Sequence, residues 1–187
     1  VVNSQSKVIY PRCFKGDIRK IYAQGEVFLE VAHDKKHPFI VESDDFKLQV
    51  LGTKFNISNY KGGTTNIVLV EGAVEVTDKN EKKARLNPND LLNIANGTIA
   101  YQKQVDVAEY ISWVEGIMLL NGNDLSQIIQ RLSIYYGISI QCDPIIGKEK
   151  VYGKLDLKDD IDEVIECIQQ TLPFTIEKSD TSIYLNK

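Results

Sequence analysis

Short runs in which apolar and polar residues alternate recur through the first half of the chain, and this period constrains the fold more than any other feature. In the run GEVFLEV at residues 25–31, every second residue from Val27 to Val31 is apolar. Successive side chains of a strand point to opposite sides, so the run predicts a strand with one buried face. Such runs repeat about every eight to twelve residues from Lys7 to Gln104, separated by turn-forming residues. This spacing is typical of an antiparallel sandwich, a barrel or a β-solenoid.

Glycine-containing turns indicate how these strands are connected. Asn96-Gly97 is a strong signal for a two-residue hairpin. We expect further hairpin corners at Lys61-Gly62-Gly63, at Glu71-Gly72 and at 78–80. The sequence thus predicts hairpins in series. Gly52 and Gly72 are expected where the backbone needs a positive φ or approaches another segment closely.

Beyond Trp113 the pattern changes to strands that alternate with two amphipathic helices. A change of period indicates a domain boundary, which we place near residues 105–115. One helix is predicted from Asp124 to about Tyr136, followed by Gly137 as a stop signal, and the other from Asp160 to about Leu172. Each begins with an aspartate that is followed three residues later by Gln or Glu, which is the pattern of a capping box.

Strands are expected around these helices at 117–120, 138–142, 151–157, 174–177 and 182–185. The resulting order, β-α-β-β-α-β-β, describes a small α+β unit in which the helices cover one face of a sheet to hide their apolar stripes. We therefore expect a mostly β domain at residues 1–110, built as an antiparallel sandwich or β-solenoid. A small α+β domain is expected to follow at residues 111–187.

The charge balance and the cysteines exclude several classes of function. A net charge of −4 and a sequence pI near 5.3 provide no basic field for nucleic acid. The longest apolar runs fall far short of the roughly 20 residues that cross a bilayer. Three cysteines at wide spacings indicate neither a zinc site nor a disulfide framework. They leave open whether Cys142 and Cys167 pair.

No pattern of residues predicts catalysis, a cofactor or a metal. The chain has no GxSxG, P-loop or GxGxxG motif. His33 and His37 have the spacing of a helical zinc pair, but they lie between two predicted strands and before Pro38, so we expect a solvated hairpin tip. The acids at 156–163 lack the pattern of a calcium loop and fit a helix N-terminus. Four glutamates alternate along neighbouring strands and are expected to face solvent: Glu26, Glu30, Glu71 and Glu75.

Aromatic residues mark two further places. Tyr110 and Trp113 lie at the expected domain junction, where a large ring is expected to hold the two domains together, and a partner pocket is the alternative. Tyr135 and Tyr136 are adjacent in a predicted helix and are not expected to point inward together. One of them is therefore expected to be an exposed aromatic, and Tyr135 is the candidate interface residue.

Four strings of the first domain carry a resemblance to a known family. GEVFLEV, HPFIVES, VLGTKFNISNY and LVEGAVEV resemble, in that order, the periplasmic core of the FecR family of transmembrane anti-sigma factors. The segment WVEGIMLLNGNDLSQIIQRLSIYYGISI resembles the passage into their C-terminal domain, which is similar to the short secretin and TonB N-terminal signalling domain. The membrane helix and cytoplasmic segment of that family are missing here, and we expect that this reflects truncation.

The resemblance implies the periplasmic portion of a bacterial single-pass inner-membrane protein. Its partners would be the signalling domain of an outer-membrane TonB-dependent transducer and, through the missing cytoplasmic segment, an extracytoplasmic-function sigma factor. Contact with the membrane would come only through the missing upstream helix. The implied role is regulatory, without catalysis or cofactor. The alternative is a carbohydrate- or cell-envelope-binding β module fused to an assembly domain.

A relay of this kind needs an edge that a partner can extend, and we predict the strand Val151–Leu157 for it. Alternate residues would pack on the helices and leave Tyr152, Lys154 and Asp156 outward. The alternative is that Tyr152 merely covers its own sheet and that Lys154 protects the edge. The last strand, at Ser182–Leu185, is the competing edge.

Overall fold

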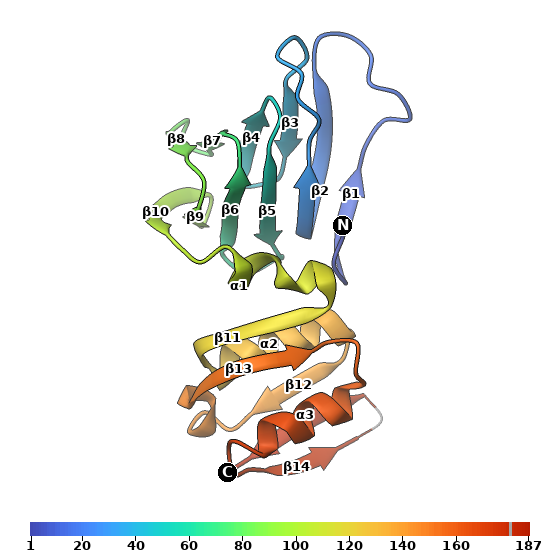
Figure 1. Ribbon diagram of the computed structural model, residues 1–187, viewed down its shortest axis with the longest axis vertical. Coiled ribbons are helices and arrows are strands. Elements are labelled where there is room, and N and C mark those ends of the chain that lie inside the picture. Colours follow the sequence, from blue (N-terminus) through green and yellow to red (C-terminus); the bar gives the residue numbers. More distant parts are fainter. Residues whose placement is uncertain (180) are drawn as a thin grey trace. The chain divides into compact units, whose positions relative to one another are not determined.

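The computed structural model describes residues 1–179 and 181–187, and it divides into two compact units, Val1–Ile111 and Ser112–Lys187 (Figure 1). The N-terminal unit consists almost entirely of strands, whereas the C-terminal unit carries the two longer helices. Each unit encloses an apolar core of its own. In the described part of the chain, no helix is both long enough and apolar enough to pass through a bilayer.

Ten strands form one sheet in the N-terminal unit, and all but one of their ladders are antiparallel. The strands are β1 (Lys7–Ile9), β2 (Arg19–Glu30), β3 (Phe39–Glu42), β4 (Phe46–Val50), β5 (Lys54–Asn59), β6 (Thr65–Glu71), β7 (Val74–Asp78), β8 (Lys83–Leu86), β9 (Asp90–Ala95) and β10 (Thr98–Gln104), with helix α1 (Ala108–Ile111) after them. The order is β10-β9-β6-β5-β2-β3-β4-β7-β8, with β1 paired to β2. Within this sheet, only β2 and β3 run parallel to each other. The mostly β character of this unit is therefore as predicted.

The long strand β2 links two parts of this sheet. Its first residues pair with β3, and its second half, Gly25–Glu30, pairs with β5. Gly25 stands at the change of partner with a φ of 90°, and a Cβ there would lie 2.4 Å from the Oγ of Ser6. Strands from both parts contribute side chains to a single core, as expected for two packed layers. Within the run that opened the sequence analysis, Val27 is buried and Glu30 is exposed, which confirms the alternation.

Three of the four expected corners join paired strands, and one does not. Asn96 and Gly97 both have positive φ, at 51° and 74°, as a type I′ hairpin requires. The expected hairpin at Glu71-Gly72 is wrong, because β6 pairs with β5 and β9 while β7 pairs with β4 and β8. The chain passes there from one part of the sheet to the other.

Gly52 and Gly72 do stand where the backbone is crowded. Gly72 has a φ of 95°, and a Cβ on it would lie 2.8 Å from the carbonyl oxygen of Gly52. A Cβ on Gly52 would lie 2.5 Å from the Cα of His33. Both glycines are therefore explained by close approach, and Gly72 by its φ as well.

The C-terminal unit has two small sheets, where one was expected. Its elements are η1 (Ser112–Glu115), β11 (Ile117–Asp124), α2 (Leu125–Tyr136), β12 (Ser139–Cys142), η2 (Ile146–Lys148), β13 (Lys150–Asp156), α3 (Ile161–Gln169), β14 (Thr175–Lys178) and β15 (Ser182–Asn186). β11 and β13 form an antiparallel pair, and β12, β15 and β14 form a second sheet. Both sheets and both helices contribute to one core. Periodicity predicts which face of a strand is buried, but it does not predict which strand lies beside it.

The two helices begin where predicted but are capped differently. The Asp160 carboxylate accepts the backbone N–H groups of Asp162 and Glu163, both at 3.0 Å, so the expected cap is present on α3. Asp124 makes no side-chain cap on α2, and its carboxylate instead forms an ion pair with Lys150 at 3.0 Å. Gly137 ends α2 with a φ of 71°, as expected. Helix α3 ends at Gln169, short of the predicted end.

Candidate partner-binding surface

Strand β13 carries the predicted contact residues on its outer face. Val151 and Leu155 are buried in the core, whereas Tyr152 is 69% exposed and Lys154 and Asp156 are exposed. In the described part of the chain, β13 pairs with β11 alone. The strand therefore has one open side next to three outward side chains.

The backbone on that open side has unused hydrogen-bonding groups. In an antiparallel ladder, alternate residues bond to the neighbouring strand. The N–H of Leu157 donates to the carbonyl oxygen of Gly116 at 2.8 Å. The alternation then directs the N–H groups of Lys154 and Asp156 to the open side, where a further strand could accept them.

Tyr152 also touches its own sheet. The ladder between β11 and β13 shifts register between Asn121 and Asn123, and Gly122 lies at this irregularity with a φ of 75°. A Cβ on Gly122 would lie 2.9 Å from the hydroxyl oxygen of Tyr152, so the ring reaches over the bulge. Tyr152 therefore covers part of its own sheet, which is the alternative that the sequence left open.

The prediction that the last strand offers a competing edge is wrong. Strand β15 runs parallel to β12 on one side and antiparallel to β14 on the other. Both of its sides are therefore paired, and it offers no edge to a partner. β15 is the central strand because it pairs with β12, which lies about forty residues away in sequence. No residue near either strand predicts this pairing.

The adjacent tyrosines of α2 are both half-buried, so the expectation that one of them is exposed is wrong. Tyr135 and Tyr136 pack against the C-terminal core, with their rings edge to face at 5.2 Å between centroids. The Tyr136 hydroxyl lies 3.1 Å from the carbonyl oxygen of Leu157 and 2.9 Å from that of Asp159. Burial, with smaller effects of Tyr135 and nearby carboxylates, raises the pKa of Tyr136 to about 12.

Tyr110 and Trp113 lie in the last helix of one unit and the first helical turn of the other. Trp113 is 6% exposed, and Tyr110 is half-buried. The backbone carbonyl of Trp113 accepts the N–H of Gly116 at 2.9 Å, in the turn that leads into β11. The role of these two residues at a domain junction stays a prediction.

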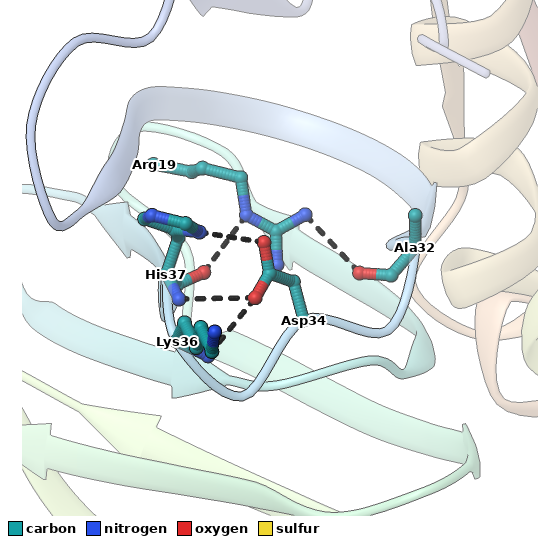
Figure 2. A network of polar contacts seen from close by, with 5 residues as sticks. All are labelled: Arg19, Ala32, Asp34, Lys36 and His37. Carbon is teal, nitrogen blue, oxygen red and sulfur yellow. Dashed lines mark hydrogen bonds and ion pairs between the residues drawn. The ribbon is translucent and has the colours of Figure 1, made fainter.

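The segment that holds both histidines is not a hairpin tip, because β2 and β3 are parallel and the segment crosses between them. His37 Nδ1 lies 2.7 Å from Asp34 Oδ2 (Figure 2). This hydrogen bond, with smaller contributions from the N–H groups of Lys36 and His37, lowers the pKa of Asp34. Among residues 1–179 and 181–187, no three His, Cys, Asp or Glu side chains gather as metal ligands would.

Arg19 holds this segment, although no sequence pattern predicts that role for it. Its Nε donates to the carbonyl oxygen of His37 at 2.9 Å, and its Nη1 donates to that of Ala32 at 3.1 Å (Figure 2). The guanidinium also lies 5.6 Å from the ring centroid of Phe39. Its only sequence signal is its position at the start of β2.

The four glutamates do not form an acid–base pair. Glu26 accepts the side-chain amides of Asn3 and Asn56, at 2.8 and 3.1 Å. Glu30 and Glu71 both lie near the ammonium of Lys54. Glu75 is held by Lys83 at 2.9 Å and Arg85 at 3.2 Å, and these partners lower its pKa. Their arrangement is that of surface ion pairs and amide contacts.

A polar hollow of about 620 Å³ lies on the N-terminal unit beside Glu75. Some of its charges are paired with one another, as between Lys79 and Asp45 at 2.7 Å and between Lys83 and Glu75 at 2.9 Å. The Tyr22 hydroxyl donates to Asp44 at 3.1 Å. Hydrogen bonding to Asp45 raises the pKa of Lys79. The lysine therefore stays protonated, and a protonated amine is not a nucleophile.

All three cysteines are free thiols. Cys13 and Cys167 are exposed, and Cys142 is half-buried against the C-terminal core. Burial raises the pKa of the Cys142 thiol, which makes it a poor nucleophile. Cys142 and Cys167 do not form a disulfide in this structure.

Comparisons with known proteins cover both units. The family described as "FecR protein" matches residues 1–75, and "FecR, C-terminal" matches residues 117–185. No curated protein matches the chain. Two crystal structures of a proposed anti-sigma factor from Parabacteroides distasonis ATCC 8503, at 1.65 and 2.50 Å resolution, are similar to it with TM-scores of 0.84 and 0.83. Each is 30% identical, and the similarity covers 100% of this chain and 88% of that one. The chain therefore belongs to the FecR family of anti-sigma factors.

Proposed function

We propose that this chain is the periplasmic relay portion of a membrane-anchored anti-sigma factor. It receives a signal from the signalling domain of an outer-membrane TonB-dependent transducer and passes it, through a cytoplasmic segment, to an extracytoplasmic-function sigma factor. The observation that carries the proposal is that both units match the same family and that the similarity to a proposed anti-sigma factor spans the whole chain. A regulatory family supports a role in binding, without catalysis.

The C-terminal unit is the part that we assign to the transducer, as a domain of the short secretin and TonB N-terminal type. Its open edge on β13 supports strand addition, in which main-chain hydrogen bonds give affinity and outward side chains give specificity. Lys154 and Asp156 would set the register of the added strand by their opposite charges. Tyr152 would supply exposed ring area.

The test is a calorimetric titration of this chain with the transducer's isolated signalling domain. Lys154→Glu should weaken binding about tenfold, because it reverses the charge beside the open edge. Lys148→Glu is the matched control, since this residue is exposed on η2 and the change in net charge is the same. Equal affinity of both variants and the unmodified chain would remove β13 from the proposal.

A proline substitution tests the main-chain bonds directly, and Lys154 is the right position for it. Leu155 is 4% exposed, so proline there would also remove a core side chain and would report unfolding. At Lys154 the N–H points to the open side, where a strand tolerates proline. We expect Lys154→Pro to weaken the titration with an unchanged melting temperature. A carbohydrate- or envelope-binding module would bind glycans in the same assay and ignore the signalling domain.

A further inference from the structure

The connection between β1 and β2 is a long stretch without regular secondary structure (Figure 1). Large apolar side chains on it are exposed. Tyr10 is 68% exposed, Phe14 41% and Ile18 48%, and Ile9 at the end of β1 is 51% exposed. Every residue from 9 to 18 is exposed. Apolar groups concentrated in this way on a surface loop mark an interaction site.

The crossover between β2 and β3 lies beside this loop. The Phe14 ring meets the Phe39 ring edge on, with 6.2 Å between centroids. The backbone N–H of Arg19 donates to the carbonyl oxygen of Pro38 at 2.9 Å, and the Arg19 side chain bonds the carbonyl of Ala32 (Figure 2). We call residues 10–19 and 31–38 together the tip.

The tip is basic in a chain that is otherwise acidic. It carries five basic residues, Arg12, Lys15, Arg19, Lys35 and Lys36, and two acidic ones, Asp17 and Asp34. The rest of the chain keeps 17 of the 22 basic residues and 24 of the 26 acidic ones. Asp34 is already engaged by His37 and by the backbone of its own loop. Arg12 and Lys15 thus face solvent next to Tyr10 and Phe14 with little opposing charge.

We propose that the tip binds the surface of a membrane that contains anionic lipid. Aromatic rings are enriched at the level of the lipid headgroups, where their position is favourable. Arginine and lysine beside them can reach the lipid phosphates. Along the first loop of the tip, large apolar and basic side chains follow one another in the order Tyr10, Arg12, Phe14, Lys15, Ile18 and Arg19. This interleaving fits a continuous anionic surface. The contact adds to any anchoring helix, and it does not depend on which protein binds β13.

The experiment is flotation of the 187-residue chain with lipid vesicles. Vesicles of phosphatidylcholine with about a third phosphatidylglycerol should carry the protein, and vesicles of phosphatidylcholine alone should carry much less. The double variant Arg12→Glu with Lys15→Glu should lower the partition coefficient at least about tenfold. Tyr10→Ser should lower it by a smaller factor. The control Lys61→Glu with Lys82→Glu, at two exposed positions outside the tip, has the same net charge and should bind as the unmodified chain does.

The exposed cysteines provide a second readout. An environment-sensitive dye on Cys13, within the tip, should shift to the blue when anionic vesicles are added. The same dye on Cys167 should not shift, with the other two cysteines changed to alanine in each case. Absence of flotation, equal binding to neutral vesicles, or equal loss in the control pair would overturn the proposal. So would a tip that binds the transducer's signalling domain and no vesicle, which would make it a protein interface.

Discussion

The two units are held together by different means. In the N-terminal unit, seven polar or charged side chains are buried, and they are Thr53, Asn56, Asn59, Thr65, Asp78, Asp90 and Asn93. The buried side chains described in the C-terminal unit are apolar. Directional hydrogen bonds fix the N-terminal strands in one arrangement, whereas apolar packing sets fewer constraints on which strand is neighbour to which. On this difference we expect the C-terminal unit to be the more easily rearranged of the two.

The sharpest test of this comparison is a cavity in each core. Phe55 and Leu132 are both fully buried, one in each core. Phe55→Ala should lower the unfolding free energy of the N-terminal unit by about 3–5 kcal/mol, and Leu132→Ala that of the C-terminal unit by about 2–5 kcal/mol. Chemical denaturation followed by circular dichroism measures both.

Trp113 separates the two effects, since it is the only tryptophan and belongs to the C-terminal unit. The two cores have no residue in common. The fluorescence transition should therefore move with Leu132→Ala and stay in place with Phe55→Ala. If both variants move it equally, the units unfold as one and the comparison fails.

One group in each unit should make stability fall at one end of the pH scale, a carboxylate in acid and a hydroxyl in alkali. In the N-terminal unit, the Asp78 carboxylate accepts the backbone N–H groups of Ile99, Lys82 and Asn80, at 2.9, 3.0 and 2.9 Å. These bonds, that of Ile99 first, hold the pKa of Asp78 below its usual value. Their contribution is present above the unfolded pKa of about 4 and is lost as pH falls through the folded pKa.

In the C-terminal unit, the pKa of Tyr136 is raised to about 12. Stability from its hydroxyl is therefore present below the unfolded pKa of about 10 and is lost as pH rises from about 10 to 12. Melting temperatures across pH, for the unmodified chain, Asp78→Ala and Tyr136→Phe, check both effects. Asp78→Ala should lower the melting temperature by more than about 4 °C near neutral pH, and less in acid. Tyr136→Phe should flatten the alkaline limb, and a limb that stays unchanged would contradict this assignment.

Local features of this fold can be predicted from the sequence, because their causes lie within a few residues. The hairpin at Asn96-Gly97, the stop at Gly137 and the cap at Asp160 all depend on neighbouring backbone geometry. The outward face of β13 likewise follows from the alternation of Val151 to Leu157. The resemblance to the FecR family is confirmed by the matching regions in both units, and the likeness of the C-terminal unit to the secretin and TonB domain stays a prediction.

Strand neighbours could not be predicted in the same way. Glu71-Gly72 has the residues of a hairpin, yet the two strands that flank it do not pair with each other. β6 pairs with β5 and β9, and β7 pairs with β4 and β8. Pairing of β15 with β12 decides that β15 has no open side, and no residue in either strand signals it. The tip could not be predicted for a similar reason, since its two loops are separate in sequence and meet through Arg19 and Phe39.

The smallest expected effect compares the two helix starts of the C-terminal unit. Asp160→Ala removes two bonds to backbone N–H groups and should cost about 1 kcal/mol of unfolding free energy. Asp124→Ala removes an exposed ion pair with Lys150, its partner across the ladder from β11 to β13, and should cost under about 0.5 kcal/mol. Added salt should reduce the effect of Asp124→Ala and leave that of Asp160→Ala nearly unchanged, because screening weakens exposed charge pairs more than short hydrogen bonds. If Asp124→Ala costs the same in low and in high salt, Asp124 also caps its helix in solution. The ion pair with Lys150 would then not have replaced that cap.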